Sequence, residues 1–150
     1  MVDINDVIPE PKNMVSWVLY DEHGNIKDSG KTMNQVQTAH KSALATQTDS
    51  TPAYATGIYG FMWVGTGAVG GVGATDLTTP VAGGRQAVTT STSAAAVVTT
   101  VATITGIGAA VTEVGAFITN AGADMMCTAA LVCTMVAADS IVITWTKTFG

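Results

Sequence analysis

Three glycines in segment 58–76, Gly65, Gly67 and Gly70, have the spacing G-x-G-x-x-G and follow an apolar run that predicts a β-strand. In a β–α–β unit this spacing binds a dinucleotide, because the loop opens a helix whose N-terminus holds the pyrophosphate. Here the loop continues as GVGATDLTTPVAGG, with more glycine, a proline and no helical periodicity. No acidic residue lies about 20 positions on to bind a ribose. We therefore interpret the segment as a long flexible loop between two strands.

Histidines, cysteines and acids that could bind a metal or act in catalysis are scattered along the chain. His23 falls in a predicted turn and His40 on a predicted helix, and no H-x-x-x-H or C-x-x-C spacing occurs. Asp21, Glu22 and Asp28 belong to one hairpin and are interpreted as a solvated face. No serine or threonine has an identifiable histidine and acid as partners. We expect no catalytic, cofactor-binding or metal-binding residue, and no enzyme.

Glu113 differs from the other acids because it follows a long uncharged run and lies beside Val114 in an otherwise apolar predicted strand. A lone carboxylate in a strand is usually paired with a lysine or capped by backbone donors. We predict a structural rather than a catalytic role for Glu113.

Charged residues make up only 11% of the 150 residues, while 47% are hydrophobic. The charged share is less than half of the usual value for a soluble domain. Two interpretations remain open: a sheet protein coated with threonine and serine, or a chain that covers much of its surface with neighbours in an oligomer or lattice.

The net charge of -5 argues against a nucleic-acid-binding protein, which needs a basic stripe to follow the phosphate backbone. The basic residues are scattered and form no cluster: Lys12, Lys27, Lys31, Lys41, Arg85 and Lys147. We therefore expect no nucleic acid among the partners.

Cys127 and Cys133 are the only cysteines and lie six residues apart on one predicted strand. At about 3.3 Å per residue they are about 20 Å apart, too far for a disulfide. We expect two free, core-facing thiols, as in a protein made in a reducing cytoplasm. The polar N-terminus MVDINDVIPEPKN does not resemble a signal peptide.

The run from Gln86 to Thr112 contains no charged residue and is long enough to span a bilayer. Threonine, serine and glycine interrupt it repeatedly, and it lacks the leucine, isoleucine and phenylalanine density that drives membrane insertion. We expect no transmembrane helix and no membrane partner.

Threonine, valine and isoleucine favour strands, because their stiff χ1 angles suit a pleated surface. The alternation in SIVITWTKTF predicts a closing strand with Ile141, Ile143, Trp145, Lys147 and Phe149 on one face. Segment 14–30 predicts a hairpin, and further strands are expected in 58–65, 85–105, 112–120 and 124–136. Alanine, glutamine and lysine predict one short helix near residues 33–46.

These elements predict a mainly β fold, either an antiparallel β-sandwich or a jelly-roll-like fold. Residues 1–12 are expected to form an extended arm and residues 13–150 a single domain. Methionine, cysteine and aromatic residues are expected in the core: Met125, Met126, Cys127, Trp17, Tyr20, Trp63, Trp145 and Phe149.

Several short motifs occur in a characteristic order. A hairpin leads to Asn34-Gln35-Val36, an apolar strand ends in VGTG, and TDL, TEVGAF and IVITWTKTF follow. This order resembles a small β-sandwich module of tailed-bacteriophage virion proteins, notably tail-fibre and tail-associated proteins. There, G-T-G, T-E-x-G-x-F and a final T-W-T-x-x-F recur in sequence. The resemblance covers roughly residues 14–150, although the segment after Gly67 contains more glycine than the usual loop.

The resemblance implies a structural protein of the virion, made in the host cytoplasm, with no catalytic residue. Because the chain ends at Gly150 without a fibre shaft or receptor-binding tip, a capsid decoration (cement) protein is favoured over a complete fibre. The implied partners are major capsid or tail proteins, with a homo-oligomer, such as a trimer, as the expected assembly. The alternatives are a tail-fibre, tail or head-tail adaptor component, or a carbohydrate- or receptor-binding module using Tyr54, Tyr59 and Trp63.

Overall fold

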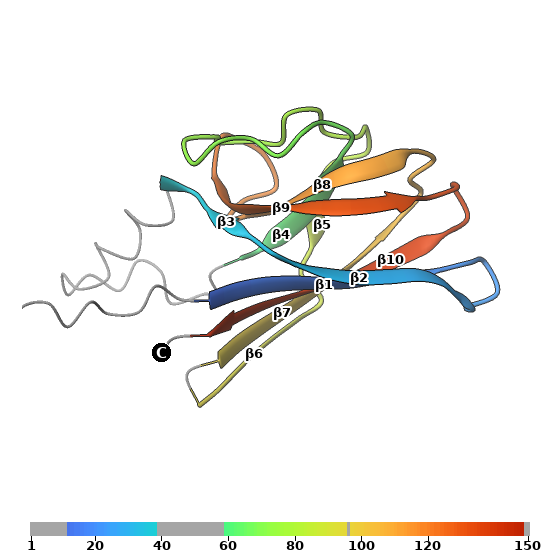
Figure 1. Cartoon of the computed structure of the whole chain (residues 1–150), viewed down its shortest axis with the longest axis horizontal. Helices are drawn as coiled ribbons and strands as arrows, with labels where there is room; N and C mark the ends of the chain where they lie inside the picture. Colours follow the sequence, from blue (N-terminus) through green and yellow to red (C-terminus); the bar gives the residue numbers. More distant parts are fainter. Residues whose placement is uncertain (1–11, 39–58, 96, 149–150) are drawn as a thin grey trace, which may run out of the picture.

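The computed structural model in Figure 1 describes residues 12–38, 59–95 and 97–148, which form two packed antiparallel sheets. The mainly β class is therefore confirmed, and the architecture is a β-sandwich. The strands are β1 (Lys12–Tyr20), β2 (Ile26–Met33), β3 (Gln35–Val36), β4 (Phe61–Gly65), β5 (Gln86–Ala87), β6 (Thr90–Ala94), β7 (Val97–Thr105), β8 (Ala110–Phe117), β9 (Met125–Thr134) and β10 (Ser140–Thr148).

Sheet A has the strand order β2-β1-β10-β7-β6, and sheet B has the order β3-β9-β8-β4-β5. In Figure 1 sheet B lies in the upper part of the view and sheet A in the lower part. Strands distant in sequence are therefore neighbours, since β1 pairs with β10 from Lys12↔Thr148 to Tyr20↔Ser140. This long-range pairing places the C-terminal strand, β10, at the centre of sheet A.

The alternating pattern of β10 places its apolar residues in the core, as predicted. Ile141 and Ile143 are 0% exposed and Trp145 is 1% exposed, while Val142 and Thr144 on the other face are partly exposed. Lys147 continues the inward face and is also buried. A period of two in the sequence therefore matches the two faces of the strand.

The predicted hairpin at 14–30 is confirmed as β1 and β2. Asp21 organises its turn, because its Oδ1 atom accepts hydrogen bonds from the backbone N–H groups of His23 (2.9 Å) and Asn25 (2.8 Å). The side-chain amide of Asn25 also donates to Asp21, and these bonds lower the pKa of the Asp21 carboxyl. His23 is exposed in this turn.

The helix predicted near 33–46 is wrong at its start. Met33 ends β2 opposite Met14, and Gln35–Val36 form β3 against β9. The backbone N–H of Gln37 then donates to Met126 O at 2.9 Å. Helix propensity is a weak preference that sheet pairing overrides here. Residues 39–46 lie outside the described residues, as do residues 1–11 of the predicted arm; Lys12 belongs to β1.

The core lies between the sheets and contains most of the residues predicted for it. Met125, Met126, Cys127, Trp63 and Trp145 are buried, whereas Trp17 and Tyr20 are half-buried and Phe149 lies outside the described residues. Both cysteines are free, buried thiols on β9, as predicted. The segment that raised the membrane question contributes to β5, β6, β7 and β8.

Candidate functional site

The glycine-rich segment between β4 and β5 is anchored to sheet B along much of its length. Thr66 N donates to Thr79 O at 2.9 Å, and Gly65 forms an isolated bridge with Pro80. Farther along, Met125 N donates to Thr75 O at 3.0 Å. The predicted long loop between two strands is therefore confirmed as the connection from β4 to β5, and backbone hydrogen bonds hold it to the sheet.

A second set of bonds joins the same segment to the end of β3. Thr38 N donates to Val72 O at 2.8 Å. The side-chain amide of Gln35, oriented to match its neighbours, donates to Gly70 O (3.1 Å) and accepts from Val72 N (2.8 Å). The glycine-rich segment is thus bonded to the Gln35 side chain of β3 and to the backbone of Thr38, which follows β3.

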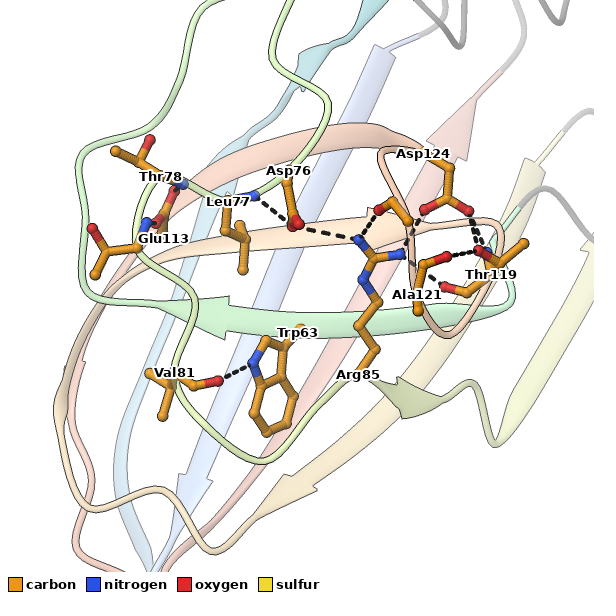
Figure 2. Close-up of polar contacts among 12 residues, drawn as sticks. Trp63, Asp76, Leu77, Thr78, Val81, Arg85, Glu113, Thr119, Ala121 and Asp124 are labelled. Carbon is orange, nitrogen blue, oxygen red and sulfur yellow. Dashed lines mark hydrogen bonds and ion pairs between the residues drawn. The ribbon is translucent and has the colours of Figure 1, made fainter.

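Glu113 is the internal anion around which this segment folds (Figure 2). Its side chain projects from β8 and is 0% exposed. One carboxylate oxygen accepts a hydrogen bond from Thr79 N (2.9 Å) and the other from Thr78 N (3.1 Å). The predicted structural role is confirmed in its backbone-capped form, because the buried Glu113 side chain is satisfied by two backbone amides.

Two glycines of the G-x-G-x-x-G motif, Gly65 and Gly67, make room for this carboxylate. A Cβ atom on Gly65 would meet Glu113 Oε1 and lie 2.7 Å from Thr79 O. A Cβ atom on Gly67 would lie 2.9 Å from Glu113 Oε1. The spacing that suggests a phosphate-binding loop therefore accommodates a carboxylate of the same chain. The backbone N–H groups of Thr78 and Thr79 donate to this carboxylate and are not available to a phosphate.

We expect Gly65→Ala to lower the free energy of unfolding by about 1–3 kcal/mol, because the added methyl group must displace backbone or a buried carboxylate. Gly71→Ala is the matched control in the same segment, since nothing lies within 4 Å of its added Cβ atom. Urea unfolding followed by tryptophan fluorescence measures both variants. Equal stabilities for the two variants would contradict the packing role of Gly65.

Arg85 fastens the other end of the segment (Figure 2). Its side chain is 7% exposed, and its guanidinium lies 3.5 Å from the centre of the Phe117 ring. It makes an ion pair with Asp124 (2.6 Å), a longer one with Asp76 (3.4 Å), and donates to the carbonyl oxygens of Thr119 and Gly122. Two carboxylates balance its charge, so the arginine clamps the 119–124 turn rather than offering an anion site.

A buried polar cluster lies between the sheets near the start of β1. Asn13 and Lys147 are opposite each other in the β1–β10 pair and are 2% and 1% exposed. Asn13 Nδ2 donates to Cys127 Sγ at 3.9 Å, and the Tyr59 hydroxyl lies 2.8 Å from the same sulfur. The Tyr59 ring also packs 5.8 Å from that of Trp145.

Burial dominates the ionisation of this cluster. It lowers the pKa of Lys147 to about 8, although the nearby Cys127 acts in the opposite direction. Burial also raises the pKa of the Cys127 thiol to about 11 and raises the pKa of Tyr59 well above its ordinary value. At neutral pH the thiol is protonated, so it lacks the thiolate that a reactive cysteine needs.

Two aromatic residues predicted for a receptor- or glycan-binding surface are not available for one. Tyr59 is 4% exposed and Trp63 is 3% exposed, and the indole N–H of Trp63 donates to Val81 O at 2.6 Å. The prediction that these residues form an exposed platform is wrong. Tyr54 and His40 lie outside the described residues.

The outward face of sheet A, named here the sheet-A face, is an extended surface with little charge. The strand register determines which residues of β1, β2, β6, β7 and β10 point outward. Among the outward residues whose side chains are described, Lys31 is the one charged residue. Met14 and Met33 face each other at its margin and are 39% and 60% exposed. Most of the other outward positions are small or β-branched, among them Ser16, Val18, Ser29, Val142, Thr144, Thr146, Val97, Thr99, Val101, Thr103, Thr90, Thr92 and Ala94, and Tyr20 and Ile26 lie at one end.

Within residues 12–38, 59–95 and 97–148, no three or more His, Cys, Asp or Glu residues group together in a way that could bind a metal ion. No helix in these described ranges is long and apolar enough to cross a membrane. Comparisons of the chain with protein-family models, curated proteins and solved structures found no match.

Proposed function

We propose that this protein is a non-enzymatic structural protein of a tailed-bacteriophage virion, specifically a capsid decoration protein that binds major capsid or other virion proteins. The motif order VGTG, TDL, TEVGAF and IVITWTKTF supports the assignment to a virion module. The low charge of the chain supports a protein that works against neighbours, because a solitary domain ordinarily needs more charged surface.

The single observation that carries the binding role is the sheet-A face. Exposed, nearly uncharged β surfaces can be desolvated at low cost, since neither salt bridges nor buried charges have to be compensated. The exposed pair Met14 and Met33 adds apolar contact area at its margin. We propose that neighbouring virion proteins pack on this face.

The close packing of the shared motifs supports a structural module. Leu77 of TDL packs at the position where a Cβ atom on Gly115 of TEVGAF would lie, and Glu113 of the same motif caps the residues after TDL. Gly65 of VGTG pairs with Glu113. The conspicuous residues thus stabilise one another, and chemistry is not needed to explain them.

Gold-labelled antibody against the protein, applied to intact virions of the phage that encodes it and viewed by electron microscopy, tests the proposal. Label spread over the capsid is the expected result. Label confined to the tail would replace decoration with a tail or adaptor role, and the absence of label from virions would overturn the virion assignment.

A charge at the centre of the sheet-A face tests the binding surface. We expect Thr144→Glu to reduce binding to virions that lack the protein at least tenfold, because the new carboxylate must be desolvated on docking. Thr144 lies on the central strand, β10, and its cost to folding is expected to stay within about 1 kcal/mol.

Val132→Glu is the matched control. Val132 lies on β9 of sheet B, away from the sheet-A face, and is 67% exposed. The control should bind virions normally. Equal binding by both variants, at unchanged thermal stability, would show that the sheet-A face is not the docking surface.

A further inference from the structure

The four edges of the two sheets differ in how they are protected. An exposed edge strand presents unpaired N–H and C=O groups, and proteins ordinarily block such edges with charge, bulges, short strands or a covering segment. In the described part of the chain the edge strands are β2 and β6 of sheet A and β3 and β5 of sheet B. Three of them carry such protection.

β2 carries Lys27, Asp28 and Lys31, and its pairing with β1 shifts register between Leu19 and Tyr20. β3 and β5 each contain two residues, and β3 is followed directly by hydrogen bonds to the glycine-rich segment. These edges therefore carry charge, are irregular, or are short. None offers a regular, uncharged strand to another chain.

β6 is different in each respect. Its sequence, TSTSA, contains no charge and no proline, all five residues are exposed, and its ladder with β7 has no register shift. Figure 1 shows β6 at the lower margin of the molecule, beyond β7. Among the described residues no strand pairs with its other side. The strand is thus ready to accept one more strand.

The charge distribution identifies another copy of the same chain as the partner. With a net charge of -5, two copies repel each other unless they meet where charge is absent. The run from Gln86 to Thr112, which contains β6, is uncharged throughout. A positively charged partner would gain nothing from this edge, whereas an uncharged strand of a like-charged copy fits it.

β6 is also complementary to itself in antiparallel orientation. A two-fold axis through Thr92 places Thr92 opposite its own copy, Ser91 opposite Ser93, and Thr90 opposite Ala94. Such pairs are small or β-branched and bring no like charges together. Because the axis is perpendicular to the sheet, both copies present their sheet-A faces on the same side.

We propose that two copies of this protein associate through antiparallel pairing of their β6 strands, which joins the two A sheets into one continuous sheet. The role of the joined face rests on the proposed function, because it doubles the surface offered to the virion. Pairing of five residues buries less area than the roughly 1,000 Å² of a stable interface, so the free dimer is weak. On the virion, where neighbouring copies are held side by side, the high local concentration favours the pairing of β6 strands.

Cysteine crosslinking of the full-length purified protein tests the pairing. Thr92→Cys is expected to form a reducible dimer under mild oxidation with copper phenanthroline at least tenfold faster than Thr103→Cys. Thr103 is the matched control, because it is exposed on β7, which lies between β10 and β6 rather than at an edge. The native cysteines are buried and contribute little background.

A charge swap within the T92C protein tests the register. T90K with A94K places lysines opposite each other and should slow crosslinking at least tenfold, whereas T90K with A94E should restore it. Crosslinking of T92C no faster than T103C, or insensitivity to the paired lysines, would overturn the proposal. This result is independent of antibody labelling of virions, so failure of the pairing and failure of the virion assignment are distinguishable.

Discussion

Replacing Glu113 with glutamine is expected to lower the free energy of unfolding by about 3 kcal/mol, one of the two largest effects predicted for this protein. The carboxylate is fully buried and accepts hydrogen bonds from Thr78 N and Thr79 N. Glutamine keeps the shape but turns its own N–H group toward one of these donors, so the buried side-chain amide and one backbone N–H lose their hydrogen bond. Urea unfolding followed by tryptophan fluorescence measures the loss.

The control is Glu22→Gln, in the exposed hairpin turn, which should change stability by less than about 0.5 kcal/mol. Hydrogen exchange gives a local readout: the Thr78 and Thr79 amides should lose protection in E113Q before the amides of β10 do. If E113Q remains as stable as the wild-type protein and protects both amides, the anchoring role of Glu113 is wrong.

The strand pattern was predictable because it depends on local chemistry. The alternation around Ile141 and Ile143 indicates a strand with one buried face, and the structure places that face in the core. Glu113 was also recognisable, because a single carboxylate in an apolar strand requires a hydrogen-bonding partner. Its partner was not, since the backbone of residues 78 and 79 carries no side-chain signal.

Features that depend on tertiary context were not predictable. Gln35 and its neighbours have helix-compatible side chains, yet β9 pairs with Gln35 and Val36 as a strand, and the side-chain amide of Gln35 bonds to the glycine-rich segment. Likewise, the glycine spacing around Gly65 indicates that another group lies close to the backbone, but the spacing does not identify that group as the Glu113 carboxylate. The partner of the Trp63 indole, Val81 O, lies in the loop and is held beside β4 by the hydrogen bond from Val81 N to Val64 O.

Lys147→Met is expected to raise the free energy of unfolding at pH 7 by up to about 3 kcal/mol. Burial lowers the pKa of this lysine from 10.5 to about 8, and each pKa unit corresponds to about 1.4 kcal/mol. The charged amine is therefore more stable in the unfolded chain than in the core. Methionine fills a similar volume without that charge, and the figure is an upper limit because methionine also loses the contacts of the buried amine.

The pH dependence distinguishes this explanation from a simple packing effect. Between pH 8 and 10.5 the unfolded chain binds the lysine proton and the folded chain does not, so wild-type stability rises with pH. From pH 9 to 11 the thiols of Cys127 and Cys133 have the opposite effect, because burial raises their pKa values from 9.0 to about 11 and the unfolded chain loses their protons first. Wild-type stability should therefore rise from pH 8 to 9 and then stop rising.

In K147M the rise between pH 8 and 9 should disappear, and above pH 9 stability should fall more steeply than in the wild-type protein, because no lysine offsets the two thiols. The stability difference between the two proteins should be largest below pH 8, shrink between pH 8 and 10.5, and vanish above pH 10.5, where the wild-type lysine is neutral in both states. Chemical unfolding at successive pH values measures both curves. A rise that persists in K147M would assign it to another group, and a K147M protein less stable at pH 7 would mean that the contacts of the buried amine outweigh its desolvation.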